Sequence, residues 1–258
     1  MFYHILDDSI VEPKFEILQD TKEFTRVKLK RSNQIVKIPK VISCQIAYLL
    51  GVVAGDGHLS VRQRKISRFP CTKLLIFNNS KDFILYLEIM LKKTFSMKSK
   101  VYKKSYNNCF VLEVNNKLVW LFFSKNLGIQ NKKYDLRVPN LVQNKELFKF
   151  FLAGIIDTDG YFDKSNKVYG LTLGGSHFNF LLQIQKLCMK FYEIKMIGPY
   201  KGIIKQNNKT YFRCELYTSA YFTKKFQEII PLIKKKWAWQ DSNLRPNPRF
   251  PKLASAKL

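Results

Sequence analysis

Residues 49–57 read LLGVVAGDG, and residues 152–160 read LAGIIDTDG. Each stretch is an apolar run with a glycine in its middle that closes on Asp-Gly, which is the pattern of a buried helix followed by a turn. The interval between the two stretches is the length of a small domain. One structural unit is therefore used twice. An acidic residue at the same point of each copy, Asp56 and Asp159, predicts a two-carboxylate site on a pseudo-twofold axis.

The residues that flank the two stretches predict where each helix begins and ends. Ser43 and Asn144 are expected N-caps, because a side-chain oxygen there accepts a hydrogen bond from the first turn. Gly57 and Gly160 are expected just after the helix, in the left-handed conformation that often stops a helix. Each stretch is thus predicted to end its helix at Asp-Gly.

The segments that follow the two stretches run in the same order. Two strands come first, then a helix that opens at a serine (Ser80 or Ser176), a hairpin that turns at residues 107–108 or 207–208, and a closing helix. The order α-β-β-α-β-β-α occurs twice, which predicts an α+β fold of tandem duplicated units. The expected parts are an N-terminal extension 1–42, a first domain 43–127, a linker 128–143, a second domain 144–239 and a tail 240–258.

The charge of the chain indicates the kind of partner. There are 45 Lys and Arg residues against 19 Asp and Glu, a formal net charge of +26. Charge of this size is the electrostatic footprint of a nucleic-acid-binding protein. Because 46% of the residues are hydrophobic and 14% are aromatic, the chain can also build real cores, which argues against disorder and weakens the alternative of a ribosomal or membrane-surface protein.

The cysteines and histidines show neither a zinc spacing nor a disulfide framework. An intracellular protein is therefore expected, in the cytoplasm or in the matrix of a mitochondrion or chloroplast, and not a secreted one. The apolar runs are too short to cross a bilayer and end in Asp, so they are interpreted as core helices. The residues concerned are Cys44, Cys71, Cys109, Cys188 and Cys214, with His4, His58 and His177.

Small residues line one face of each predicted motif helix, and small side chains let two helix backbones approach closely. They are Gly51, Ala54 and Gly55 in the first helix, and Ala153, Gly154 and Thr158 in the second. If these helices lie side by side, Asp56 and Asp159 meet at the same end, where the helix dipoles are also negative. Adjacent carboxylates repel each other. We therefore predict divalent cations between them, with Mg²⁺ favoured because it binds hard oxygen ligands and shares phosphate oxygens.

Both stretches resemble the defining motif of the LAGLIDADG homing endonucleases, and the repeated order of elements matches the fold of that family. The resemblance covers roughly residues 43–237. It implies a pseudo-twofold saddle in which antiparallel sheets face DNA and the two motif helices form the interface. The first stretch has Ala54 where the motif has an earlier Asp. Because the metal-binding acid of the family is the later one, Asp157 in the second stretch is not expected to be essential.

The resemblance also implies an activity. Two-motif members resemble single-chain pseudo-dimers that cut both strands of one long DNA site, so we expect a monomeric, intron-encoded, site-specific endonuclease that hydrolyses phosphodiester bonds and needs no protein partner. Asp56 and Asp159, with Gly55 and Thr158 beside them, are the implied ligands of two or more Mg²⁺ ions. A diverged duplication favours an asymmetric target over a palindrome.

Further catalytic residues are implied by the same resemblance. Basic residues follow the last helix of each half near the scissile phosphates, and Lys132 and Lys236 are the expected ones. The position just before the cap of the second helix often carries a polar group that orients water, and it falls on Asn78 and on Gly174. A glycine cannot do this, so the two half-sites are expected to differ chemically.

Polar and basic residues alternate with apolar ones in the first strand of each half, which gives each sheet one polar face. On an open sheet of a basic protein, such side chains favour contacts with base edges in the major groove. His58 lies beside the Asp-Gly turn, so we expect it to contact phosphate. The predicted DNA-binding residues are His58, Ser60, Arg62, Arg64 and Lys73 in the first half, and Tyr161, Asp163 and Ser165 in the second.

Other functions remain open at this stage. The same fold serves intron maturases, which bind RNA and assist splicing with or without cleavage, so intron RNA is an alternative partner. A relic that only binds DNA is a third option. The paired acids favour the nuclease, because a pure nucleic-acid binder has no need of them. We expect no intein, since the chain begins Met-Phe-Tyr and ends Ala-Lys-Leu without the terminal residues of splicing.

Overall fold

The computed structural model describes residues 15–30, 34–62, 71–104, 109–130, 133–134, 136–206 and 209–232. The predicted order of seven elements is present twice. The first unit consists of α1 (Cys44–Gly55), β4 (Gly57–Arg62), β5 (Cys71–Asn78), α2 (Lys81–Phe95), β6 (Lys100–Lys103), β7 (Phe110–Val114) and α3 (Lys117–Leu127).

The second unit repeats the first with one added 3-10 turn, η3. It consists of α4 (Lys145–Asp159), β10 (Gly160–Asp163), β11 (Val168–Gly174), η3 (Gly175–His177), α5 (Phe178–Tyr192), β12 (Met196–Gln206), β13 (Lys209–Thr218) and α6 (Ala220–Ile229). The duplicated α+β fold predicted from the sequence is confirmed. The domain boundaries stay a prediction, since the second domain and the tail extend beyond the described residues.

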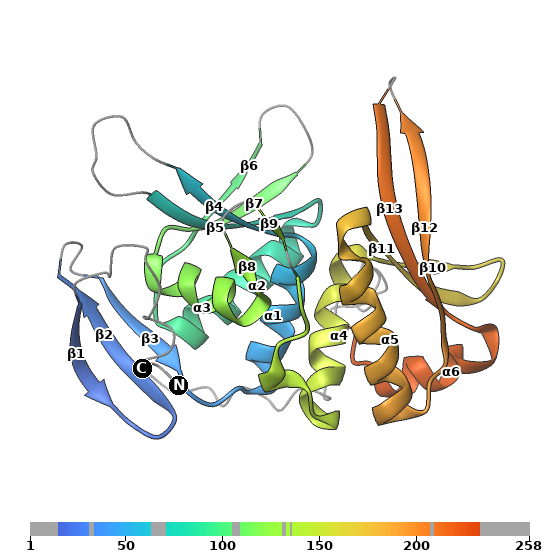
Figure 1. The fold of residues 1–258 in the computed structure, drawn as a ribbon. Helices are drawn as coiled ribbons and strands as arrows, with labels where there is room; N and C mark the ends of the chain where they lie inside the picture. Colours follow the sequence, from blue (N-terminus) through green and yellow to red (C-terminus); the bar gives the residue numbers. More distant parts are fainter. Residues whose placement is uncertain are drawn as a thin grey trace.

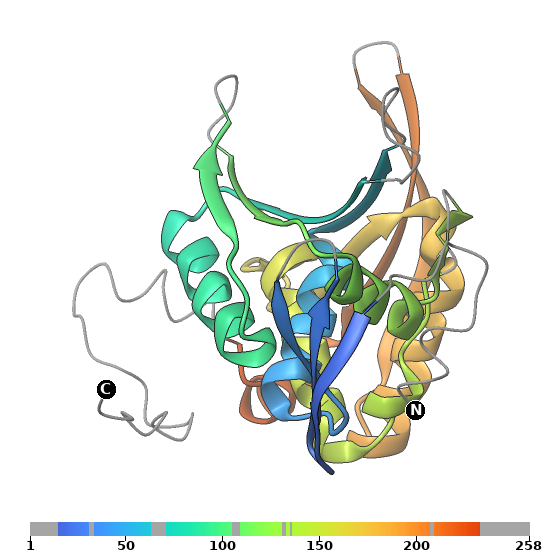
Figure 2. The ribbon, with the colours of Figure 1, turned by 90° about the vertical axis from the view of Figure 1, so that its left-hand side faces the viewer.

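Each unit holds one four-stranded antiparallel sheet, and the two sheets have the same strand order. The orders are β4-β5-β7-β6 and β10-β11-β13-β12. Figure 1 shows α1 and α4 side by side in the middle of the molecule, with the sheets on the side where these two helices end. In the view of Figure 2 the hairpins β6–β7 and β12–β13 rise on either side of the sheets, so the surface between them is concave.

The N-terminal extension is a small sheet rather than the single hairpin or arm expected. The strands β1 (Phe15–Asp20), β2 (Phe24–Leu29) and β3 (Ile35–Pro39) pair antiparallel in that order. Its inner residues Val27 and Val36 are fully buried in the main core, and β3 lies against α2 and α3. The linker adds the short strands β8 (Ile129–Gln130) and β9 (Lys133–Tyr134) and a 3-10 turn, η2 (Asn140–Val142).

Three of the four predicted helix caps are confirmed. Backbone N–H groups of the first turn donate to Ser43 Oγ at 3.3 Å, to Ser80 Oγ at 3.3 Å and to Asn144 Oδ1 at 2.9 Å. The prediction for Ser176 is wrong. Ser176 lies inside η3, and α5 begins after His177 without a side-chain cap. The chain makes a 3-10 turn there before the helix starts, so Ser176 is part of that turn and is not the residue that precedes α5.

The two glycines that end the motifs are not left-handed, contrary to expectation. Gly160 has φ −85° and ψ 156°, and Gly57 is an ordinary residue of β4 without a positive φ. Both positions require glycine because the backbone passes very close to the last turn of the preceding helix. A Cβ on Gly57 would lie 2.3 Å from the carbonyl oxygen of Val53, and one on Gly160 would lie 2.4 Å from that of Ile156. Only glycine lets the strand leave so close to the last turn of its helix.

The cores lie between the helices and the inner faces of the sheets and are rich in aromatic residues. In the first unit the rings of Phe95 and Phe122 meet edge to face with centroids 5.3 Å apart, and in the second unit Phe151 and Phe180 do the same at 6.3 Å. Within the described ranges, none of the helices has the length and apolar character that crossing a membrane requires.

Candidate active site

The two motif helices touch through their backbones, as the small residues predicted. A Cβ on Gly51 would lie 2.0 Å from the carbonyl oxygen of Phe151, and one on Gly154 would lie 2.3 Å from that of Tyr48. Any larger residue would push α1 and α4 apart, so glycine is required on both sides of the contact. This contact sets the two helices side by side (Figure 1).

The contact continues to the ends of both helices and places the two motif acids at one end of the pair. A Cβ on Gly55 would lie 2.0 Å from Thr158 Oγ1 and 2.6 Å from Asp159 Oδ2. Asp56 follows Gly55 directly and forms the C-cap of α1. The acids of α1 and α4 therefore meet below the concave surface, where both helix dipoles add negative charge. A site of this kind attracts cations.

Asn78 holds the Asp56 carboxylate. Its Nδ2 donates to Asp56 Oδ2 at 2.7 Å, and its Oδ1 accepts a hydrogen bond of 3.0 Å from the backbone N–H of Ser80. The asparagine is buried at the end of β5, so both of its polar groups are fixed. The sequence predicted that Asn78 orients water, and the structure shows that it orients the acid.

The second unit has no asparagine at this place, and strand register corrects the position that the sequence indicated. In the first unit the motif glycine pairs with Ile76, and Asn78 stands two residues beyond. In the second unit the motif glycine pairs with Leu171, so the equivalent residue is Leu173 rather than Gly174. Leu173 is buried like Asn78 but has no side-chain donor. The two halves therefore differ in this polar group, as expected, but the residue that replaces the asparagine is Leu173 and not Gly174.

Asp157 is part of the helix interface. Tyr48 of α1 donates its hydroxyl to Asp157 Oδ2 of α4 at 2.8 Å, and both side chains are buried. Burial, and next the charge of Asp157, raise the pKa of Tyr48 well above its usual range, so the tyrosine stays protonated and donates. Tyr48 was not among the residues predicted from the sequence. The polar hydroxyl in an apolar run was the available signal, but its partner lies on the other motif.

The predicted DNA-binding residues of the first unit lie on β4 and β5. Leu59 is buried against the core and His58 before it is exposed, but the expected alternation does not continue, because Val61 is 41% exposed. Ser60 pairs with Lys73 across the two strands but is largely buried. Lys73 is held by Glu113 in an ion pair of 2.6 Å. Arg62 closes β4.

The predicted DNA-binding residues of the second unit lie partly on β10 and partly in the turn that follows it. Tyr161 is an exposed residue of β10. Asp163 is the last residue of β10, and it accepts hydrogen bonds from Ser165 and Asn166. These bonds, first that from the Ser165 hydroxyl, lower the pKa of Asp163 to about 2. Ser165 therefore lies in a turn, beyond the strand on which the alternation had placed it. Arg64, Lys132 and Lys236 lie outside the described residues.

The atoms at the helix ends that could bind a metal ion are all oxygen atoms. In the described part of the chain, no three His, Cys, Asp or Glu side chains gather into a metal site of their own. The last carbonyl groups of a helix have no partner within it, so Asp56 and Asp159 are accompanied by main-chain oxygens. Two carboxylates with carbonyls suit a hard cation such as Mg²⁺, which fills its other positions with water and phosphate oxygens.

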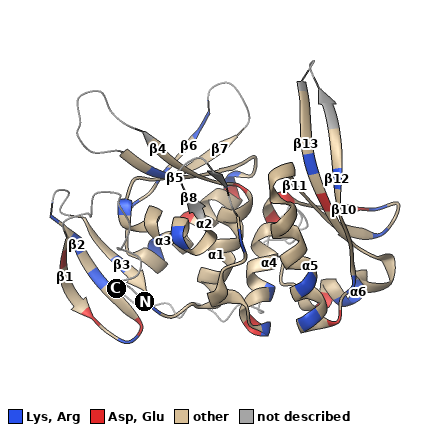
Figure 3. Cartoon of the chain, in the orientation of Figure 1, with Lys and Arg blue, Asp and Glu red and all other residues tan. Residues whose placement is uncertain are grey.

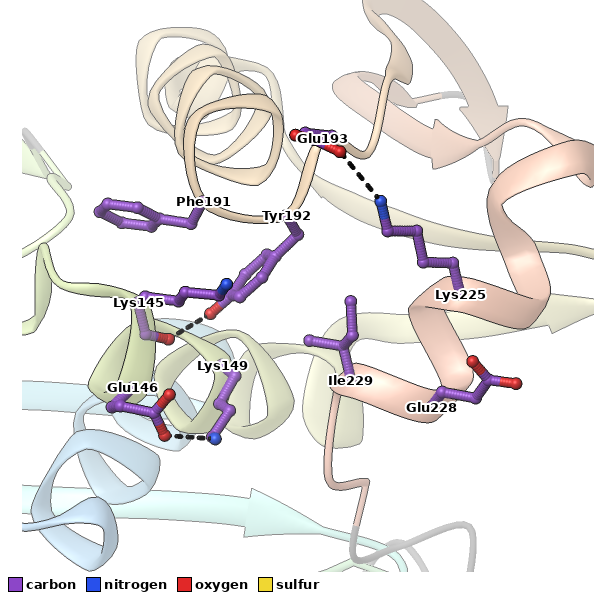
Figure 4. Close-up of a pocket in the computed structure, with 9 residues that line it drawn as sticks. All are labelled: Lys145, Glu146, Lys149, Phe191, Tyr192, Glu193, Lys225, Glu228 and Ile229. Atoms are coloured by element: carbon purple, nitrogen blue, oxygen red, sulfur yellow. Dashed lines mark hydrogen bonds and ion pairs between the residues drawn. The ribbon is translucent and has the colours of Figure 1, made fainter.

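A crevice of about 410 Å³ lies elsewhere, at the opposite end of α4. Figure 4 shows its lining, which includes Lys145, Tyr192 and the ion pair between Glu193 and Lys225. Lys145 begins α4 and Asp159 ends it, which separates them by about 21 Å at 1.5 Å per residue. Basic and acidic side chains alternate around the crevice, so it does not favour a ligand of either charge. It is separate from the paired acids.

Comparison with known proteins agrees with this geometry. Residues 43–128 match the family described as "LAGLIDADG-like domain". The structure of the homing endonuclease I-DmoI in complex with DNA and Ca matches with a TM-score of 0.55 and 18% identity, over 77% of this chain and 97% of that one. The fold is that of the LAGLIDADG homing endonucleases. The structure of I-WcaI bound to its DNA recognition sequence matches with a TM-score of 0.51 and 14% identity, over 81% of this chain and 89% of that one.

Curated relatives share a similar segment inside much longer chains. The glutamine–fructose-6-phosphate aminotransferase of Methanocaldococcus jannaschii is 29% identical over 160 residues, which are 60% of this chain and 13% of the relative. An A-type ATP synthase protein of Pyrococcus abyssi is 29% identical over 163 residues, 62% of this chain and 15% of the relative. The chain thus spans a small part of each. The two names describe unrelated activities, so neither carries a function to this protein.

Proposed function

We propose that this protein is a site-specific endonuclease that, as a monomer, hydrolyses both strands of one long, asymmetric site in double-stranded DNA. The observation that carries the proposal is the meeting of Asp56 and Asp159 at one end of the paired helices, below a concave surface formed by two sheets. The net charge of +26 supports an anionic substrate. I-DmoI and I-WcaI, which share the fold, were solved with DNA.

The reaction depends on divalent cations, for which we propose Mg²⁺. The ligands would be the carboxylates of Asp56 and Asp159 and the main-chain carbonyls of Gly55 and Thr158. The Thr158 hydroxyl donates to the carbonyls of its own helix, at 2.8 and 3.1 Å, so its contribution is the main-chain oxygen. When bound, such cations activate water and stabilise the leaving oxygen.

The protein's own side chains orient the site and bind the DNA. Asn78 keeps one oxygen of Asp56 in place and so fixes how that carboxylate is turned toward a ligand. We propose that Lys132 and Lys236 stabilise charge on the scissile phosphates. The exposed His58, which lies two residues after Asp56, would contact a phosphate of the DNA backbone. Sequence would be read by the polar faces of the two sheets. An intron-encoded origin follows from the family resemblance and is part of the proposal.

The alternative is an RNA-binding maturase, since a basic saddle accepts either nucleic acid. A randomised duplex library incubated with the protein and Mg²⁺, followed by sequencing of the cut ends, separates the two. We expect a single long asymmetric site cut in both strands, and no cutting when Mg²⁺ is chelated. If the DNA stays intact in both Mg²⁺ and Mn²⁺, and the protein binds structured RNA more tightly than duplex DNA, the maturase function is favoured over the nuclease function.

A further inference from the structure

Each of the two four-stranded sheets carries one ion pair that includes an acid of its third strand. In the first unit Lys73 Nζ of β5 is 2.6 Å from Glu113 Oε1 of β7, and Tyr102 donates to the other carboxylate oxygen at 3.3 Å. In the second unit Arg213 Nε is 3.2 Å from Glu215 Oε1, both on β13. Figure 3 shows the basic and acidic bands next to each other on β13. Both acids come from the third strand of their sheet.

Strand alternation places the second pair on the concave face. Cys214 and Leu216 are fully buried against the helices. Successive side chains of a strand point to opposite faces. Arg213 and Glu215 therefore point away from the helices, into the space proposed for DNA.

The first pair faces the same way. Leu112 and Val114, which flank Glu113 on β7, are fully buried, and so is Leu74, which follows Lys73 on β5. Both side chains of this pair therefore point away from the helices as well.

Sheet stability alone is a weak reason for these pairs. The side chains are 29% and 15% exposed in the first pair and 40% and 27% in the second, and an ion pair that water still reaches contributes little to folding stability. An acid on a DNA-binding face also repels phosphate. Hydrogen bonds, first from Lys73, lower the pKa of Glu113, so that carboxyl keeps its charge near neutral pH. A carboxylate kept in this place is best explained by a hydrogen-bond donor on the DNA.

We propose that each ion pair reads one G·C base pair in the major groove, with the cation on guanine and the carboxylate on cytosine. This inference rests on the proposed function. The edge of a G·C pair presents two adjacent acceptors, guanine N7 and O6, and then one donor, cytosine N4. A lysine has three donors. One is held by Glu113, so two remain for the two acceptors. Arg213 Nε lies 3.2 Å from Glu215 Oε1, and the two terminal nitrogens of a guanidinium carry further donors for the same contact.

An A·T pair fits less well. Adenine N7 is a single acceptor followed at once by the N6 donor, and the next group is the O4 acceptor of thymine. A cation with two spare donors would lose one contact, and a carboxylate over O4 would be repelled. The geometry therefore predicts a G·C pair in each half of the target, at the base pair covered by each ion pair.

The test uses the full chain and the site recovered from the randomised library. Affinity is measured for that duplex and for every single base-pair substitution of it, with wild type, Glu113→Gln and Glu215→Gln. We expect wild type to prefer G·C at one position in each half. Each variant should lose on the order of tenfold of that preference at one position, in its own half only. Because a negative charge is removed, binding to unrelated duplexes should tighten slightly.

Glu228→Gln is the matched control, because it removes the same charge from the exposed surface of α6. It should leave every base preference unchanged. Unchanged preferences in Glu113→Gln and Glu215→Gln, with a lower Tm, would show that the pairs only brace the sheets and would overturn the inference. A preference for A·T at these positions would overturn it too. If wild type selects no site, the proposed function fails first, and the inference falls with it.

Discussion

The two units share their helix contact and differ in what surrounds their acids. Gly51 and Gly154 meet as equivalent residues, and each unit supplies one acid to the same end of the helix pair. Asp56 is held by a buried asparagine, whereas the matching place beside Asp159 is Leu173. The duplication has thus kept the residues that set the geometry and changed a residue that tunes the chemistry. Two half-reactions with different rates are the expected consequence.

The hairpins differ as well. β6 and β7 have 4 and 5 residues, whereas β12 and β13 have 11 and 10. At about 3.4 Å per residue, β13 is about 17 Å longer than β7. The longer hairpin can follow DNA for several more base pairs, so the two halves of the target should differ in length as well as in sequence.

The largest effect should come from the acids that the units share. Asp56→Asn and Asp159→Asn should each abolish double-strand cleavage and leave DNA affinity within a few-fold, because these carboxylates serve the metal ions. Cleavage assays and binding isotherms on the same duplex measure both quantities. Asp157→Asn is the control, since it lies two residues from Asp159 and should cut nearly as well as wild type. Normal cutting by either motif variant would show that the acids do not share one site.

The helix contact should be the next most sensitive. Gly51→Ala places a methyl group 2.0 Å from the carbonyl oxygen of Phe151, and overpacking of this kind costs about 1–3 kcal/mol or more. Urea unfolding should show this loss. Gly174→Ala is the matched control, because the nearest atom to its Cβ would be 3.7 Å away, on His177. Equal stability of the two variants would contradict the backbone contact.

Asn78→Leu gives the first unit the residue of the second. Removing a hydrogen bond to a charged group is worth about 1.5–3 kcal/mol, so one strand should be cut roughly ten- to a hundredfold more slowly. Nicked DNA should then accumulate on gels of single-turnover reactions. Leu173→Asn is the reverse exchange, and its effect should fall on the other strand. If Asn78→Leu slows both strands equally, the asparagine supports the whole site and not one half of it.

The hydrogen bond between Tyr48 and Asp157 has no counterpart related by the pseudo-twofold axis. Asp157 has Ala54 as its counterpart in the first motif, so only α4 supplies an acid to the contact. Tyr48→Phe removes the hydroxyl that donates to this buried carboxylate and should lower the free energy of unfolding by about 1–2 kcal/mol. Tyr221→Phe, at a side chain that is 85% exposed, is the control and should change nothing measurable. An unchanged stability in Tyr48→Phe would mean that the carboxylate finds another donor.

Sequence alone predicted most of the fold, because its signals are local. Apolar runs closed by Asp-Gly and capping side chains such as Ser43 and Asn144 lie next to the helix ends that they specify. The small residues predicted the helix contact, since only a close approach explains Gly51 and Gly154 together. These features repeat in the two units, and repetition made each of them more informative.

What the sequence missed depends on residues far apart in the chain. Strand register decides that Leu173 rather than Gly174 matches Asn78, and no count along the sequence supplies the register. The partner of Tyr48 lies on the other motif, 109 residues away. The role of Gly57 depends on how close its strand passes to the preceding helix, which the Asp-Gly dipeptide alone does not show.

The smallest expected effect concerns the point where the first strands of the two units diverge. β4 has 6 residues, whereas β10 has 4 and ends at Asp163, whose carboxylate binds the turn that follows. The fold lowers the pKa of Asp163 from 3.8 to about 2. A lowered pKa means that the ionised form is favoured in the folded state. The resulting stability is complete above about pH 4 and is lost as the pH falls toward 2.

Removing the donors should return this pKa toward its usual value. NMR titration of the Asp163 carboxyl should give a midpoint near 2 in wild type and a higher one in Ser165→Ala, because the hydroxyl is the largest cause of the shift. Lys164→Ala is the control, since no shift of Asp163 is attributed to that side chain. Equal midpoints in wild type and Ser165→Ala would mean that the turn does not depend on the carboxylate. The different lengths of β4 and β10 would then need a cause other than Asp163.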